Sequence, residues 1–270
     1  MNKGNIITGL FALLLLLGLG GYSLMPKNTK SEGYVGIPTV FVHGYKGTVN
    51  SFGNMLQRFE NEYKYGVVGM TYFVNADGSL HTQHLARSNG KPLFIQVVFE
   101  NNRTSFAETT NYLANVLHNL KSTYQIDTVN LVGHSMGGIV SLKYIMEYDG
   151  KAYPRVEKLV TIGSPFAGIF DPNYFITHTD RGAEDLKMDS LALRMLHTST
   201  FPEHVKVLSI GSTGDAVAVP ESVAQLRKIV PSSQLKEVML EDETLGHSAL
   251  HEHAGVDQLI YRFLWQDLAQ

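Results

Sequence analysis

The sequence predicts an α/β fold in which helices cover both faces of a mostly parallel sheet. Short apolar runs rich in β-branched residues alternate along the chain with stretches of helical length, a pattern typical of parallel strands joined by helices. One such strand is followed at once by a glycine-rich turn and a helix, over residues 128–148. With 270 residues and 44% hydrophobic content, we expect a single core and a single main domain.

The composition excludes several classes of partner and site. The net charge is −3 and no basic run is present, so the electrostatic pattern of a nucleic-acid-binding protein is missing. The chain has no cysteine, which excludes disulfides, thiolate metal sites and a cysteine nucleophile. Nothing in the sequence indicates a cofactor, and nothing in it fixes the oligomeric state.

Residues 1–30 have the pattern of an export signal or a membrane anchor. Lys3 precedes a charge-free stretch over residues 6–25, and Lys27 and Lys30 follow it. This stretch is long enough to cross a bilayer, whereas a cleaved signal usually has a shorter apolar region; small residues at 18–23 nevertheless allow cleavage. Both interpretations place residues 31–270 outside the cell or at its surface, anchored in the membrane if the segment stays uncleaved.

The elements before the central turn follow in order. We expect strands at residues 37–42, 67–74 and 92–99, and helices at residues 52–59 and 105–124. Ser105 and Glu108 form a capping-box pattern at the start of the second helix. Asn75–Gly78 is a strong turn signal. We interpret the polar stretch after it, with His81 and His84, as loop rather than a metal site, because no third ligand converges there.

After the central turn the alternation continues, with one interruption. We expect strands at residues 128–132, 157–162, 205–210 and 236–240, and helical segments at residues 139–148, 219–230 and 256–268. Residues 170–204 break the rhythm and contain an amphipathic pattern in which Met188, Leu191 and Met195 share one helical face.

The central turn reads Gly133-His134-Ser135-Met136-Gly137, with Gly138 next. In a GxSxG turn between strand and helix, glycine is needed where a side chain would strike the neighbouring strand or helix. The strained turn holds the serine hydroxyl clear of the backbone, with the first N–H groups of the helix close behind it. Ser135 is therefore the candidate nucleophile, and the alternative is a tight structural turn that happens to contain serine.

The segment NLVGHSMGG resembles the elbow of α/β-hydrolases of the lipase and esterase branch, and this resemblance covers the chain from about Pro38 to its end. Together with the later segment HSALHE, it is also similar to proteins described as cell-surface hydrolases of Gram-positive bacteria. The resemblance implies an α/β-hydrolase fold and action on carboxylic esters. It further implies that residues 170–204 form a cap that shapes acyl or alcohol specificity; a packed surface excursion is the alternative.

The strand at 37–42 ends in His43-Gly44-Tyr45, where this fold places half of its oxyanion hole. The resemblance implies that the backbone N–H groups of Tyr45 and Met136 are the two donors, with Gly44 as the alternative to Tyr45. We interpret His43 as a residue that braces this loop, not as a catalytic base. Ser164 is a poor rival nucleophile, because the following Pro165 has no N–H to donate.

Asp215 is the candidate acid, since it follows the strand at 205–210 in a loop of small residues. The alternative is that Asp215 lies in an ordinary turn and that the acid comes from the cluster Glu241, Asp242 and Glu243. The base follows the acid in this fold, so His247, His251 and His253 are the candidates, and we choose His247 because it lies in the loop beyond the last strand. The helical spacing of His247 and His251 leaves a zinc site as the rival chemistry.

Ser135, Asp215 and His247 occur in the order nucleophile, acid, base, each after a separate predicted strand. We expect a serine hydrolase that acts on a small-molecule or lipid-like ester through an acyl-enzyme, without cofactor or metal. The alternatives are an acyltransferase or thioesterase with the same triad, a zinc-dependent hydrolase, and a non-catalytic cell-surface binding protein on a hydrolase scaffold.

Overall fold

The computed structural model describes residues 35–148, 150–198 and 200–266. The export or anchor segment predicted at residues 1–30 lies outside these ranges. Within them, no helix combines the length and the apolar character needed to cross a membrane.

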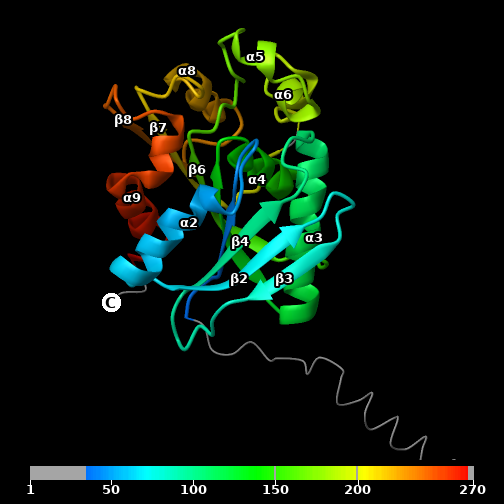
Figure 1. Ribbon diagram of the computed structural model, residues 1–270, viewed down its shortest axis with the longest axis vertical. Helices are drawn as coiled ribbons and strands as arrows, with labels where there is room; N and C mark the ends of the chain where they lie inside the picture. The colour runs from blue at the N-terminus through cyan, green and yellow to red at the C-terminus, as the bar shows by residue number, and fades with distance from the viewer. Residues whose placement is uncertain (1–34, 149, 199, 267–270) are drawn as a thin grey trace, which may run out of the picture.

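In the described residues the sheet has eight strands in the order β3-β2-β4-β1-β5-β6-β7-β8 (Figure 1). Every neighbouring pair is parallel except β2 and β3, so the prediction of a mostly parallel sheet is confirmed. The strands are β1 (Thr39–Val42), β2 (Val67–Val74), β3 (Leu80–His84), β4 (Leu93–Phe99), β5 (Thr128–His134), β6 (Arg155–Ile162), β7 (Lys206–Ser212) and β8 (Leu235–Leu240).

Strand β3 corrects the interpretation of His81 and His84 as loop residues. The turn Asn75–Gly78 is formed as predicted, with Gly78 at φ +81° and its N–H donating to the Asn75 carbonyl at 2.9 Å. The chain then returns antiparallel to β2 at the edge of the sheet, with most of its side chains exposed. A polar, solvated edge strand lacks the apolar alternation that identifies strands in a sequence.

Helices cover both faces of the sheet (Figure 1). One face is covered by α3 (Phe106–Tyr124) and α4 (Met136–Glu147), and the other by α2 (Asn50–Gln57), which continues into a π-helical turn at Arg58–Glu62, and by α9 (Ala254–Leu264).

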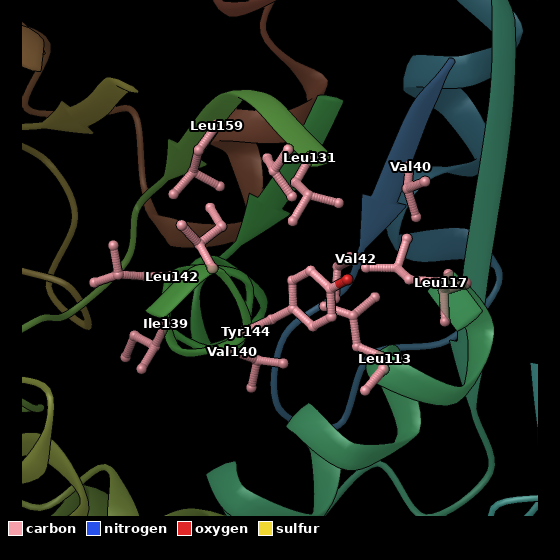
Figure 2. Close-up of a cluster of buried hydrophobic side chains, with 14 of the residues drawn as sticks. Val40, Val42, Leu113, Leu117, Leu131, Ile139, Val140, Leu142, Tyr144 and Leu159 are labelled. Carbon is pink, nitrogen blue, oxygen red and sulfur yellow. The ribbon is translucent and has the colours of Figure 1, made fainter. Parts of the chain in front are cut away.

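Successive residues of β1 serve the two faces in turn. Val40 and Val42 join the buried cluster that includes Leu117 of α3 (Figure 2). Phe41 belongs to the second cluster, where its ring meets that of Phe52 of α2 edge-on at 5.4 Å between centroids. A strand buried on both faces needs a continuous apolar run, which is why this segment could be identified from its sequence.

Residues 170–204 lie over the carboxyl ends of the strands, at the top of Figure 1. They form three short helices, α5 (Tyr174–Thr177), α6 (Arg181–Asp185) and α7 (Leu191–Met195). The prediction that Met188, Leu191 and Met195 share one helix face is wrong, because Asp189 has φ +60° and α7 begins only after its N-cap Ser190. Its predicted apolar face is exposed, and α7 packs inward through Leu193 instead.

After β7 the chain forms α8 (Pro220–Val223) and a 3-10 helix at Ala224–Lys228, which together match the predicted helical segment 219–230. A second 3-10 helix, His247–Glu252, follows β8 and leads into α9.

Candidate active site

Ser135 lies between the end of β5 and the start of α4, in a backbone conformation that is rare for a residue with a side chain. Its φ is 56° and its ψ is −128°. The Ser135 N–H donates to the Ile162 carbonyl of the neighbouring strand β6 at 2.8 Å, which holds the turn in place. A Cβ at Gly137 would lie 2.1 Å from the Val42 carbonyl oxygen, so glycine is required there by close approach of the backbone.

The structure brings Ser135, His247 and Asp215 together in one hydrogen-bonded row. His247 Nδ1 lies 2.7 Å from Asp215 Oδ2, and His247 Nε2 lies 2.9 Å from Ser135 Oγ. Because an ionised carboxylate only accepts, the tautomer that fits this contact has its proton on Nδ1, which leaves Nε2 to accept the Ser135 hydroxyl proton. This is the arrangement that a general base needs to activate a serine.

Asp215 is held so that one oxygen is free to face His247. The residue is 1% exposed, and its Oδ1 accepts the N–H groups of Val217 and Ala218 at 2.9 and 2.8 Å. These two bonds orient the carboxylate and satisfy its buried charge. Of the alternative acids, Asp242 instead accepts the N–H and hydroxyl of Thr244, two bonds that lower the pKa of Asp242.

The other two candidate bases have different surroundings. His253 caps α9 by accepting the Gly255 N–H on Nδ1 at 3.1 Å. His251 lies in the same 3-10 helix as His247, where residues four apart do not share a face, so the helical spacing behind the zinc alternative is absent. Among the residues that the structure describes, no group of three or more His, Cys, Asp or Glu side chains is placed to hold a metal ion.

His134 contacts the candidate base His247, although sequence analysis assigned His134 no role. Its buried ring donates from Nε2 to the His247 carbonyl oxygen at 3.1 Å. Burial lowers the pKa of His134 well below its ordinary value, so the ring is neutral and keeps one nitrogen free of a proton. The only signal in the sequence is its place inside the elbow motif, directly before the candidate nucleophile.

Gly44 and Met136, two of the residues predicted for the oxyanion hole, lie beside Ser135. A Cβ on Gly44 would sit 2.7 Å from Ser135 Cβ and 3.2 Å from the Met136 nitrogen, so the loop passes directly over the start of α4. Met136 is the first residue of α4, where backbone N–H groups have no acceptor within the helix. The positive end of the helix dipole adds to the attraction for a developing anion at this point.

His43 has both ring nitrogens engaged by the backbone. Nδ1–H donates to the Gly44 carbonyl at 2.9 Å, and Nε2 accepts the Phe99 N–H at 3.0 Å. The ring therefore ties the end of β4 to the loop after β1, as the interpretation of His43 as a brace requires. Burial lowers the pKa of His43 to about 4.

This lowered pKa predicts a loss of stability in acid. As the pH falls from 6.5 to about 4, the unfolded chain protonates His43 and the folded chain does not, so the free energy of unfolding falls by about 3 kcal/mol on account of this residue. Urea unfolding of the full chain at a series of pH values measures this loss. His43→Gln should lack the part of this loss that is due to His43, whereas the part due to His134 is present in both proteins. Equal pH dependence of the free energy of unfolding in the wild type and in His43→Gln would contradict the prediction.

Ser164 lies behind the elbow and takes no part in the hydrogen-bonded row of Ser135, His247 and Asp215. It is fully buried, and a Cβ on Gly138 of α4 would sit 2.1 Å from its Oγ. Ser164 therefore packs against the helix that follows the candidate nucleophile.

Comparison with known proteins agrees with this fold. A GPI inositol-deacylase of Coccidioides immitis (strain RS) is 23% identical over an alignment of 221 residues that covers 74% of this chain; the chain spans only 18% of that protein's length. The crystal structure of the lin2722 gene product of Listeria innocua has a TM-score of 0.69 at 26% identity, covering 86% of this chain and 94% of its own. A protein of Lactobacillus plantarum WCFS1 described as a presumed cell surface hydrolase has a TM-score of 0.64 at 21% identity. The match covers 87% of this chain and 92% of that protein.

The family model described as "alpha/beta hydrolase of unknown function" (DUF915) matches residues 26–267, nearly the whole chain. With this match, the parallel sheet and the strand-turn-helix elbow, the chain belongs to that family of α/β-hydrolases.

Proposed function

We propose that the protein is a serine hydrolase that cleaves carboxylic esters through an acyl-enzyme, with Ser135 as nucleophile, His247 as base and Asp215 as the orienting acid. The observation that supports this most strongly is the hydrogen-bonded row from Ser135 Oγ through the His247 ring to Asp215, with distances of 2.9 and 2.7 Å. Serine in a strained elbow, an imidazole within hydrogen-bond distance of its hydroxyl and a buried carboxylate on the other side of the ring are the parts that acyl transfer requires.

In this mechanism His247 Nε2 takes the proton of Ser135 as Oγ attacks the ester carbonyl carbon. The carbonyl oxygen becomes an oxyanion, which the N–H groups of Tyr45 and Met136 stabilise. His247 then gives its proton to the departing alcohol oxygen, leaving the acyl group on Ser135. Water hydrolyses this acyl-enzyme with His247 again as base, while Asp215 stays ionised and stabilises the imidazolium.

The substrate class that we propose is an ester of a lipid-like or small acyl group. The relative from Coccidioides is named as a deacylase, which is the same overall chemistry, although it is a much longer protein. Residues 170–204 are proposed as the cap that shapes acyl specificity. They lie over the carboxyl ends of the strands, where the loops carrying Ser135 and Asp215 also begin (Figure 1).

We also propose a location outside the cell or at its surface, with residues 1–30 as signal or anchor and residues 31–270 as the hydrolase domain. The charge-free run at 6–25 supports this proposal, as does the description of the Lactobacillus protein of similar fold.

The test compares one acyl group in three linkages. The full chain is assayed with the aryl ester, the thioester and the anilide of the same fatty acid, at several acyl lengths. We expect turnover of the ester, with kcat/KM depending on acyl length through the cap. A preference for the thioester would instead support the thioesterase alternative. Absence of any turnover in folded protein would favour the binding-protein alternative.

A further inference from the structure

The side chain of Tyr45 joins the loop after β1 to residues 170–204. Its hydroxyl donates to Asp180 Oδ2 at 2.6 Å, across 135 residues of sequence. Asp180 is also the N-cap of α6, where its Oδ1 accepts the Ala183 N–H at 3.1 Å. The Asp180 carboxylate therefore caps the start of α6 and also binds the side chain of Tyr45, the residue whose N–H we assign to the oxyanion hole.

A second hydrogen bond runs parallel to the first. Lys46 Nζ lies 3.1 Å from His178 Nε2, and His178 Nδ1 lies 2.7 Å from the Tyr174 carbonyl oxygen. Since a carbonyl only accepts, Nδ1 carries the proton and Nε2 accepts from Lys46. The ring of Tyr45 also packs edge-on against the ring of His178, at 5.7 Å between centroids.

The loop after β4 contacts both α6 and the loop after β1. The Gly182 N–H of α6 donates to the Arg103 carbonyl at 2.8 Å, and the Lys46 N–H donates to the Asn102 carbonyl at 2.8 Å. A Cβ on Gly182 would lie 3.0 Å from Cδ2 of Tyr45, so the cap helix is packed directly on this ring.

The backbone that carries these contacts is not in a relaxed conformation. Lys46 has φ +60°, in the left-handed region that residues with side chains rarely adopt. Such a conformation persists only where the surroundings impose it. The loop that carries the Tyr45 N–H is held by the backbone bonds of Lys46 and Gly47, whose N–H groups donate to the Asn102 and Gly44 carbonyls, and by the side-chain contacts of Tyr45 and Lys46.

We propose that Tyr45 is a positioning residue, whose hydroxyl, held by Asp180, fixes its own backbone N–H in the oxyanion hole and couples the cap to catalysis. The inference rests on the proposed function. An oxyanion donor is effective only within about 2.7–3.1 Å of the developing charge, so a small shift of the loop weakens it. Burial of the ring and the Asp180 carboxylate both raise the pKa of Tyr45, which keeps the hydroxyl a donor.

The test uses Tyr45→Phe in the full chain, which removes the hydroxyl and keeps the ring. We expect kcat for an aryl ester to fall by about tenfold, part of the loss that follows removal of a whole oxyanion donor, with KM within about twofold. The affinity for a trifluoromethyl ketone, which forms a tetrahedral adduct, should fall by the same factor. A purely structural role of the hydroxyl would not link these two quantities.

Two further variants sharpen the result. Asp180→Asn keeps the helix cap but removes the charged acceptor, so it should lower kcat, and combining it with Tyr45→Phe should add little. Tyr148→Phe is the matched control, because its hydroxyl also donates to a side chain, that of Asn111, on the face of α3 and α4. We expect it to behave as the wild type.

The outcomes separate this inference from the proposed function. If the wild type neither hydrolyses esters nor forms the ketone adduct, the proposed function fails first. If the wild type is active and both Tyr45→Phe and Asp180→Asn keep its kcat and ketone affinity, the positioning role is overturned while the proposed function stands. Additive losses in the double variant would also overturn it.

Discussion

Ser135→Ala is expected to lower kcat for ester hydrolysis by about 10⁴- to 10⁶-fold and to leave the protein folded. Alanine keeps the Cβ that already tolerates φ 56°, so the elbow itself has no new strain. The lost hydroxyl donates only to His247 Nε2, a partly exposed contact, and its removal should change the free energy of unfolding by about 1 kcal/mol or less. Steady-state kinetics and urea unfolding measure the two quantities.

Ser164→Ala is the matched control for this substitution. Ser164 is also a buried serine that follows a core strand, but its Oγ packs against Gly138 and not against a base. We expect it to keep at least half of the wild-type kcat. Normal activity in Ser135→Ala, or loss of activity in Ser164→Ala alone, would remove the nucleophile assignment.

Asp215→Asn is expected to lower kcat by about 10⁴-fold with little change in the fold. The amide oxygen can still accept the N–H groups of Val217 and Ala218, so the loop keeps its anchor. The amide nitrogen then faces His247 Nδ1 and donates to it, which forces the imidazole proton onto Nε2. A protonated Nε2 cannot accept the proton of Ser135.

The matched control is Asp242→Asn. Asp242 belongs to the acidic cluster that the sequence left as an alternative, and its carboxylate accepts from Thr244 instead of a histidine. We expect this variant to keep the wild-type kcat. A large loss in Asp242→Asn together with a small one in Asp215→Asn would show that the acid is misassigned.

The core strands and the elbow could be predicted from the sequence because local rules determine them. A strand buried on both faces must be continuously apolar, as around Phe41, and a strained elbow must have glycine where the backbones meet, as at Gly137. The proximity of the loops that carry Ser135, His247 and Asp215 also follows from topology, since loops at the carboxyl ends of parallel strands meet at one edge of the sheet.

The contacts around this site could not be predicted in the same way. Asp180 lies 135 residues from Tyr45, and its own sequence context indicates only a helix cap. His134 is identified as a partner of the His247 carbonyl only once the last loop is placed over the elbow. Strand β3 and the extent of α7 depend on what packs beside them, which periodicity alone does not contain.

The most direct test of the central claim is to treat the full chain with a fluorophosphonate and locate the adduct by peptide mass spectrometry. We predict one adduct, on Ser135, because a serine hydroxyl paired with a histidine that can take its proton reacts far faster than an ordinary serine. Ser135→Ala should give none. An adduct on another residue, or no adduct in wild-type protein shown to be folded, would contradict the assignment of Ser135, His247 and Asp215 as a catalytic triad.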